Sequence, residues 1–146
     1  MTDALPLLVD LSLVTATGTT GLADEDRLCS LARFVLEAEG ATGSWEIAVA
    51  LLRDDEIQTL HRQFMDADEP TDIMTFPYGD ETQGGDLAIS ADHALARAGE
   101  WGNSPSQEID FLVAHGVLHL LGWQDTTAAQ RAIMLARQED LVKSWR

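Results

Sequence analysis

The spacing of apolar residues changes between two periods along the chain, which predicts a fold that contains both strands and helices. Residues 6–14 (PLLVDLSLV) alternate loosely and are rich in Leu and Val, a pattern typical of a strand. Further along, Leu28, Leu31 and Val35 recur at the spacing of one helical face, so we predict a helix over residues 24–39. The chain is therefore expected to begin with a strand followed by a helix.

The following segments continue this mixture. Residues 45–52 (WEIAVALL) are apolar almost throughout, which predicts a strand near the centre of a sheet. The same reasoning predicts further strands at residues 71–78 and 84–90, and further helices at residues 54–65, 91–101 and 127–143. The sum is one α+β domain over residues 1–146, with a four-stranded mixed sheet packed by about five helices. The pattern leaves the order of the strands open.

One further helix has the best-marked start in the chain. Ser104, Pro105 and Gln107 occupy the N-cap, first and third helical positions of a capping box, with proline where a helix tolerates it. The helix is predicted to run through FLVAHGVLHLL and to end at Gly122, because glycine readily adopts the conformation that follows a helix. Since this segment is apolar nearly all round, we expect it to be buried.

The end of this helix carries a candidate metal site, in the segment HGVLHLLGWQD (residues 115–125). His115 and His119 are four residues apart and therefore lie on one face of the helix. A turn at Gly122 can bring Asp125 back to the same ion. Zinc accepts histidine nitrogen and carboxylate oxygen, and three protein ligands leave a fourth position open for water, as hydrolytic sites require.

Two histidines at this spacing are a weak motif alone, because a histidine on an apolar helix is commonly a core residue with a hydrogen-bond partner. Two rings buried together without partners would cost a few kcal/mol, and a shared metal removes that cost. The residue after His115 is Gly116, where H-E-x-x-H metalloproteases carry their catalytic glutamate. Peptide hydrolysis by that route is therefore disfavoured, and the glycine instead allows backbone or substrate to approach closely.

The composition of the chain limits the cellular compartments and the classes of binding partner that are expected. Lys and Arg number 9 against 25 acidic residues, a formal net charge of −16 with no basic stripe, which argues against tight non-specific binding of polyanions. No apolar run is long enough to span a bilayer, and the N-terminus reads as a first strand rather than a signal peptide. Cys29 is the only cysteine, so a reducing compartment and a cytoplasmic location are expected, with no membrane partner.

Several ordered blocks of the sequence resemble one known family. HGVLHLLGWQD resembles the H-G-x-L-H-L-x-G-Y-D-H signature of the YbeY family, bacterial endoribonucleases that mature ribosomal RNA. PTDIMTFPY, GGDLAIS and LHRQF resemble the family's P-T-D-V-L-S-F-P, G-D-I-x-I-S and L-N-x-x-Y blocks, in family order from about residue 45 onward. The resemblance implies the α+β fold, one zinc ion per chain and metal-dependent cleavage of single-stranded RNA; another divalent ion stays open as the cofactor.

The resemblance also implies a place in the cell and a set of partners. It implies action on the ribosomal RNA precursor of the small subunit, a role in ribosome quality control, and contact with the small subunit. Ribosomal or assembly proteins stay open as further partners. Two alternatives stay open for the function: a metal-dependent hydrolase of a non-RNA substrate, and a non-catalytic metal-containing factor of ribosome assembly.

The sequence departs from the family pattern at two site positions. The family's first two metal histidines correspond to His115 and His119, but its third ligand, usually histidine, is Asp125 here. The family arginine that ends L-N-x-x-Y-R corresponds to Met65, which cannot stabilise the charge of a phosphate. Arg62, three residues earlier on the same predicted helix face, is the candidate replacement, and a solvated surface position is the alternative.

The predicted catalytic residues are therefore His115 and Arg62. Thr71 and Asp72 precede a predicted strand beside the expected cleft and are candidates for substrate contact, with a turn-capping role as the alternative.

Overall fold

The computed structural model describes residues 5–16, 18, 19, 21–69, 71–79 and 81–146; the other residues of the predicted domain, 1–4, 17, 20, 70 and 80, lie outside this description. The strands are β1 (Leu8–Thr15), β2 (Ser44–Leu52), β3 (Ile73–Pro77) and β4 (Gln83–Ser90). The helices are α1 (Glu25–Ala38), α2 (Asp54–Met65), α3 (Ala91–Trp101), α4 (Pro105–Leu120) and α5 (Ala128–Trp145). The predicted α+β domain with a four-stranded sheet and five helices is confirmed over the described residues.

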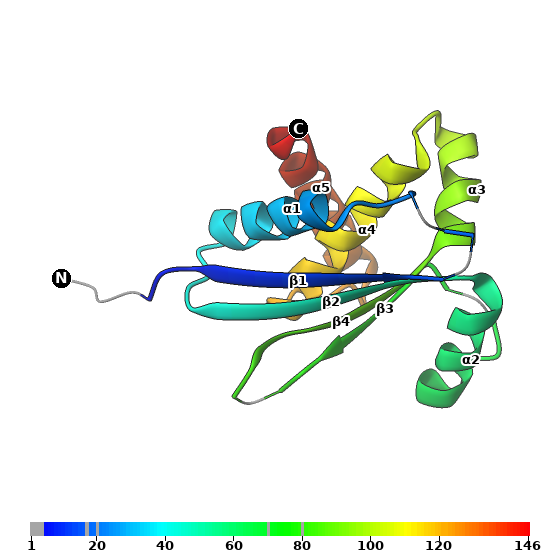
Figure 1. Cartoon of the computed structure of the whole chain (residues 1–146), viewed down its shortest axis with the longest axis horizontal. Coiled ribbons are helices and arrows are strands. Elements are labelled where there is room, and N and C mark those ends of the chain that lie inside the picture. The colour runs from blue at the N-terminus through cyan, green and yellow to red at the C-terminus, as the bar shows by residue number, and fades with distance from the viewer. Residues whose placement is uncertain (1–4, 17, 20, 70, 80) are drawn as a thin grey trace.

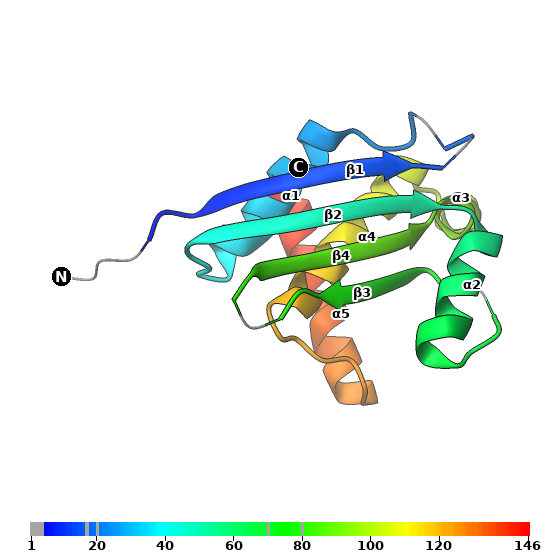
Figure 2. The ribbon, with the colours of Figure 1, turned by 60° about the horizontal axis from the view of Figure 1, so that its bottom comes forward.

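The strands form one mixed sheet in the order β1-β2-β4-β3 (Figure 2). β2 pairs in parallel with both β1 and β4, whereas β3 runs antiparallel to β4. The prediction that residues 45–52 form a central strand is confirmed, because β2 has a hydrogen-bonded neighbour on each side. Alternate residues of β2, from Trp45 to Leu51, are buried under the helices, whereas Ala48, Ala50 and Leu52 on the other face are half-buried, so the apolar run covers one fully buried face and one partly covered face.

The helices divide unequally between the two faces of the sheet. α1, α4 and α5 lie over one face, and α2 lies on the other side at the end of the strands (Figure 1). The main core lies between the sheet and helices α1, α4 and α5, and it includes Leu31, Val49 and Leu87. A smaller cluster of Ile57 on α2 with Met74 and Ala88 lies on the opposite face. This division leaves a hollow beside β3, where the candidate site is found.

The two sequence signals predicted for the ends of α4, the capping box and the glycine, are both present in the structure. The Ser104 side chain accepts a hydrogen bond from the Gln107 N–H at 3.1 Å, and the Gln107 side chain accepts one from the Ser104 N–H at 2.9 Å. Beyond the end of α4, Gly122 has φ of +103°, a conformation that side chains with a Cβ disfavour. The capping box therefore fixes the residue at which α4 begins, and Gly122 allows the chain to turn after the helix ends.

α4 is also tied to the C-terminal end of the chain through a buried carboxylate. Asp110 has a side chain that is 1% exposed and accepts hydrogen bonds from Arg27 on α1 and from Arg146. The two guanidinium groups stack on Trp145 and Phe111, respectively, at 4.8 and 5.3 Å from the ring centroids. α1, α4 and the end of α5 are thus fastened around one acid. None of the helices in the described ranges is long and apolar enough to cross a membrane.

Candidate metal centre

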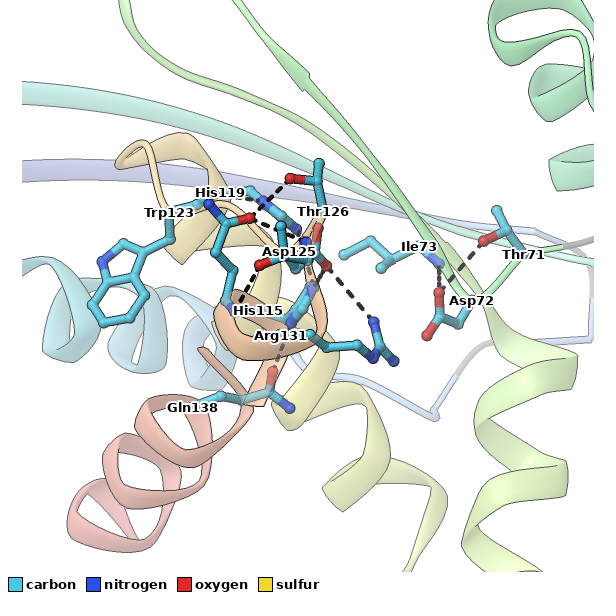
Figure 3. A network of polar contacts seen from close by, with 12 residues as sticks. Thr71, Asp72, Ile73, His115, His119, Trp123, Asp125, Thr126, Arg131 and Gln138 are labelled. Atoms are coloured by element: carbon cyan, nitrogen blue, oxygen red, sulfur yellow. Dashed lines mark hydrogen bonds and ion pairs between the residues drawn. The ribbon is translucent and has the colours of Figure 1, made fainter. Parts of the chain in front are cut away.

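The structure brings His115, His119 and Asp125 together at one end of α4 (Figure 3). The two histidines occupy successive turns of one helix face, with ring centroids 4.7 Å apart and planes at 81°. The turn after Gly122 carries the chain back, so that Asp125 Oδ2 lies 3.2 Å from Nε2 of His115 and 3.3 Å from Nε2 of His119. The two Nε2 atoms are 3.1 Å apart. The three predicted ligand atoms therefore form a nearly equilateral triangle.

The hydrogen bonds on the far side of each ring determine which nitrogen faces this triangle with a lone pair. His119 Nδ1 lies 2.9 Å from the backbone carbonyl oxygen of Trp123, which can only accept, so Nδ1 carries the hydrogen. His115 Nδ1 lies 2.8 Å from the Oε1 atom of Gln138 on α5 and donates in the same way. In the neutral rings both Nε2 atoms are then unprotonated and point at each other and at a carboxylate oxygen.

Three electron-rich atoms at such short separations repel one another unless they share a cation. Tetrahedral zinc, with bonds of about 2.0–2.1 Å to nitrogen and oxygen, places its ligand atoms about 3.3 Å apart. The observed separations of 3.1 to 3.3 Å match this spacing. Second hydrogen bonds from ring nitrogens to a carbonyl or amide oxygen are also what metal-binding histidines commonly make. The residues present therefore fit a divalent cation.

The triangle faces a cleft of about 840 Å³ that is lined by residues of α2, β3, α3, α4 and α5. Apolar walls come from Ile73 on β3 and from Phe111 and Leu112 on α4. Thr71 and Asp72, the candidates for substrate contact, line the same cleft. A group bound to an ion here would be held against β3, within a cavity large enough for several atoms of a substrate.

Asp72 has the capping role, and its side chain also borders the cleft. Its Oδ1 atom accepts the backbone N–H of Ile73 at 2.8 Å, which fixes the first residue of β3. Its backbone carbonyl accepts the N–H of Ser90 at 2.9 Å, and the Thr71 hydroxyl lies 3.5 Å from its carboxylate. The capping role is therefore present, while both side chains also border the cleft.

Arg62 is placed differently from the expectation that it would reach the cleft. It is not among the residues that line the cleft, and its guanidinium lies 3.6 Å from Asp68 with 56% of the side chain exposed. The orientation of α2 explains this position, because Ile57 is fully buried and Arg62 lies about 140° around the helix from it. Met65, which is 65% exposed, lines the cleft instead.

The cleft residues that were not predicted from the sequence include Arg97 on α3 and Arg131 and Gln138 on α5. Arg131, Leu135 and Gln138 follow one another at intervals of four and three residues and all line the cleft, so helical periodicity could have identified this face of α5. Arg131 Nη1 lies 3.8 Å from Asp125 Oδ2. Arg97 carries no comparable signal, because it is a single exposed arginine on α3.

Gly116 has a packing role in this structure. A Cβ atom built on it would lie 2.7 and 2.9 Å from the methyl carbons of Leu87 and 3.0 Å from Ile73 Cδ1. The close approach that glycine was expected to allow is therefore made by side chains of the sheet. This contact sets α4 close against β3 and β4 and so fixes the depth of His115 in the cleft.

Comparison with known proteins agrees with the architecture and the site segment. The sequence model of the family described as Endoribonuclease YbeY matches residues 17–146. The endoribonuclease YbeY of Moorella thermoacetica is 40% identical over 119 residues, which cover 72% of this chain and 76% of the relative. That of Bacillus licheniformis is 31% identical over 145 residues, covering 88% and 92%.

A solved structure shares the same fold. The solution structure of TM1509 from Thermotoga maritima is similar with a TM-score of 0.65 and 26% sequence identity, covering 95% of this chain and 88% of that chain. The sequence resemblance is thus confirmed by a family match over most of the chain and by relatives of comparable length. The chain belongs to the endoribonuclease YbeY family.

Proposed function

We propose that this protein is a metal-dependent endoribonuclease that cuts single-stranded RNA in the maturation of small-subunit ribosomal RNA. The observation that carries the proposal is the triangle of His115 Nε2, His119 Nε2 and Asp125 Oδ2 facing the cleft. Relatives named as endoribonucleases support the reaction class. The proposed cofactor is one zinc ion per chain, for which the donor set and its spacing are suitable.

His115, His119 and Asp125 would hold the ion, which when bound supplies a Lewis acid for a phosphodiester. The chain's own residues orient the ion's ligands. The Trp123 carbonyl fixes the ring of His119, and Gln138 fixes that of His115, so that neither imidazole has to reorient when the ion binds. Preorganised donors of this kind avoid a reorganisation cost during the reaction.

The walls of the cleft are suited to an unpaired strand. Phe64 on α2 is 63% exposed at the cleft and packs edge-on against Phe76, with ring centroids 5.3 Å apart. An exposed aromatic ring offers a stacking surface for a base, and single strands present such bases where duplexes do not. Thr71 and Asp72 are the proposed polar contacts to the sugar or base edges of the strand.

Family membership and charge together suggest the setting. We infer that the substrate is a ribosomal RNA precursor associated with the small subunit and that the protein acts in ribosome quality control in the cytoplasm. Because the net charge is −16, ribosomal or assembly proteins that supply positive charge would help to bring the enzyme to RNA. This acidic surface is also the feature that favours the two alternatives, a hydrolase of a less anionic substrate or a non-catalytic assembly factor.

The test combines metal analysis with RNA cleavage. Purified protein is assayed for bound metal per chain and incubated with single-stranded and duplex RNA, before and after chelation and zinc readdition. We expect close to one zinc per chain and cleavage of the single strand that is lost on chelation and restored by zinc. Asp125→Asn and His115→Ala should lose both metal and cleavage. Asp140→Asn, which removes the same charge from an exposed position of α5, should keep both.

Each other outcome is informative. Stoichiometric metal without cleavage of any RNA would exclude the endoribonuclease and favour one of the alternatives. Protein that binds no divalent ion would contradict the metal centre itself.

A further inference from the structure

Almost all of the positively charged side chains of the protein lie beside an acidic side chain. Eight of the nine Lys and Arg side chains lie within 4 Å of a carboxylate: Arg27, Arg33, Arg53, Arg62, Arg131, Arg137, Lys143 and Arg146. Within the described ranges, Arg97 is the one cation that has no such partner. It is exposed and lines the cleft that contains the candidate metal centre. In a chain with 25 acidic residues, this unpaired position is a feature to explain.

Among the cations that pair with an acid, Arg131 is held least closely by its partner. Its distance of 3.8 Å to Asp125 Oδ2 is the longest of the ion pairs, and 56% of its side chain is exposed. Oδ2 is also the atom that faces both histidine Nε2 atoms. An ion bound to that oxygen would offset its charge and weaken its attraction for the guanidinium. Arg131 would then be free to bind another anion in the cleft.

We propose that Arg97 and Arg131 bind phosphate groups of the RNA strand and supply the positive charge that Met65 does not. The inference rests on the proposed function. The two side chains come from α3 and α5, the helices on either side of α4 (Figure 1), and both border the cleft. Guanidinium groups bind phosphate oxygens through paired N–H donors, and they remain charged at any pH that the protein tolerates.

The other positively charged side chains are poorly placed to bind phosphate, so Arg97 and Arg131 should account for most of the attraction for RNA. The other arginines and the lysine have carboxylates at 2.5 to 3.6 Å, so a phosphate near them also meets a negative charge. Each phosphate contact to a single strand contributes about 0.7 to the slope of log affinity against log salt concentration. The proposal therefore predicts a small slope that comes largely from two residues.

The experiment measures that slope. A fluorescent single-stranded oligonucleotide with 2′-O-methyl riboses is titrated with the zinc-loaded full chain at a series of salt concentrations, and its integrity is checked after each titration. The variants are Arg97→Gln, Arg131→Gln and the double variant. Arg33→Gln is the matched control, because Arg33 pairs with Glu37 on α1 and does not line the cleft. Arg62→Gln tests the sequence-based alternative.

We expect Arg97→Gln and Arg131→Gln each to weaken binding several-fold and to lower the slope by about 0.7, and the double variant to lower it by about twice as much. Arg33→Gln and Arg62→Gln should leave it unchanged. Unfolding temperature and zinc affinity are measured in parallel. If Arg131 only positioned Asp125, Arg131→Gln would change zinc affinity without changing the slope, and this result would overturn the inference for that residue.

The two proposals fail in different ways. If the wild-type protein cleaves single-stranded RNA but Arg97→Gln and Arg131→Gln keep its affinity and slope, the inference is wrong while the proposed function stands. A loss of slope in Arg62→Gln alone would assign the phosphate contact to α2 instead. If the wild-type protein neither binds the strand nor cleaves RNA, the proposed function fails and the inference fails with it.

Discussion

The Nδ1 atom of His115 on α4 lies 2.8 Å from the Oε1 atom of Gln138 on α5. This bond joins positions 23 residues apart in the chain and makes α5 part of the candidate metal centre. It holds the His115 ring in the tautomer and orientation that direct Nε2 toward His119 and Asp125.

Replacing Gln138 should therefore weaken metal binding without touching a ligand. Gln138→Ala is expected to lower zinc affinity by about 10–100-fold, the usual effect of removing a hydrogen-bond partner behind a metal-binding histidine. Gln138→Glu keeps an acceptor at the same place and should bind zinc nearly as well as the wild type. Competition against a chromophoric chelator gives both affinities. Unchanged affinity in Gln138→Ala would show that Gln138 does not orient the ring.

The close contact at Gly116 predicts a cost for a single methyl group. Gly116→Ala places a Cβ at 2.7 to 3.0 Å from Leu87 and Ile73, so we expect it to destabilise the protein by about 1–2 kcal/mol through overpacking. Gly99→Ala in α3 is the matched control, because nothing lies within 4 Å of the added atom. The control should stabilise the protein by about 0.5–1 kcal/mol through helix propensity.

Urea unfolding followed by far-ultraviolet circular dichroism compares the two variants at equal denaturant slopes. If both alanines shifted the free energy of unfolding in the same direction, the packing explanation of Gly116 would be wrong. A decrease in zinc affinity in Gly116→Ala would show in addition that the distance between α4 and the sheet sets the position of His115.

Tyr78 is the only tyrosine in the chain, so its titration is not overlapped by that of another tyrosine. Its hydroxyl donates to Asp86, and this hydrogen bond, with burial and the negative charges of Asp86 and Glu46, raises the pKa of Tyr78 to about 12. Near-ultraviolet absorbance should follow ionisation of the folded protein at about this pH, and Asp86→Asn should lower the pKa toward the ordinary value of 10.0.

The same shift has a consequence for stability. Because the pKa is higher in the folded protein, the contribution of Tyr78 is fully present below pH 10 and is lost as the pH rises toward about 12. Asp86→Asn should reduce this pH dependence. Ionisation of the wild-type tyrosine near pH 10 in the folded state would contradict the hydrogen bond to Asp86.

The ion pairs of Asp110 allow a comparison of the stability that is lost when the acid or its two arginines are replaced. Asp110 is 1% exposed, whereas Arg27 and Arg146 are 42% and 30% exposed and can reach water. Replacing both arginines with methionine leaves a buried carboxylate unpaired and should cost about 3 kcal/mol. Asp110→Asn keeps the shape and frees two arginines that water can solvate, so about 1 kcal/mol is expected. Chemical denaturation measures both; a greater loss in Asp110→Asn would reverse the assignment.

Local signals in the sequence predicted most of the fold and the grouping of the candidate metal donors. The capping box at Ser104 and the glycine at position 122 define α4, and together with the four-residue histidine spacing they predicted how Asp125 could return to the site. The apolar run of β2 identified the central strand. These features depend on neighbours within a few residues, which is why they can be read from the chain.

The other features depend on contacts between distant segments. The insertion of β4 between β2 and β3 has no local signature. Arg62 was expected in the cleft because it shares a helical spacing with Met65, but the burial of Ile57 against Met74 and Ala88 sets the rotation of α2 and turns Arg62 toward Asp68. Tertiary packing thus decided which arginine borders the site.

The three donors of the candidate metal centre follow one another within residues 115–125, whereas the opposite wall of the cleft comes from residues such as His61 and Ile73. Closing so short a loop around an ion costs little chain entropy. During synthesis, the side of the cleft that His61 and Ile73 line is therefore made before the three donors, whereas the side that Arg131 and Gln138 line is made after them. A chain that stops before residue 125 is expected to lack the complete donor set, and an ion captured by a partly folded segment would not by itself show that the cleft is intact.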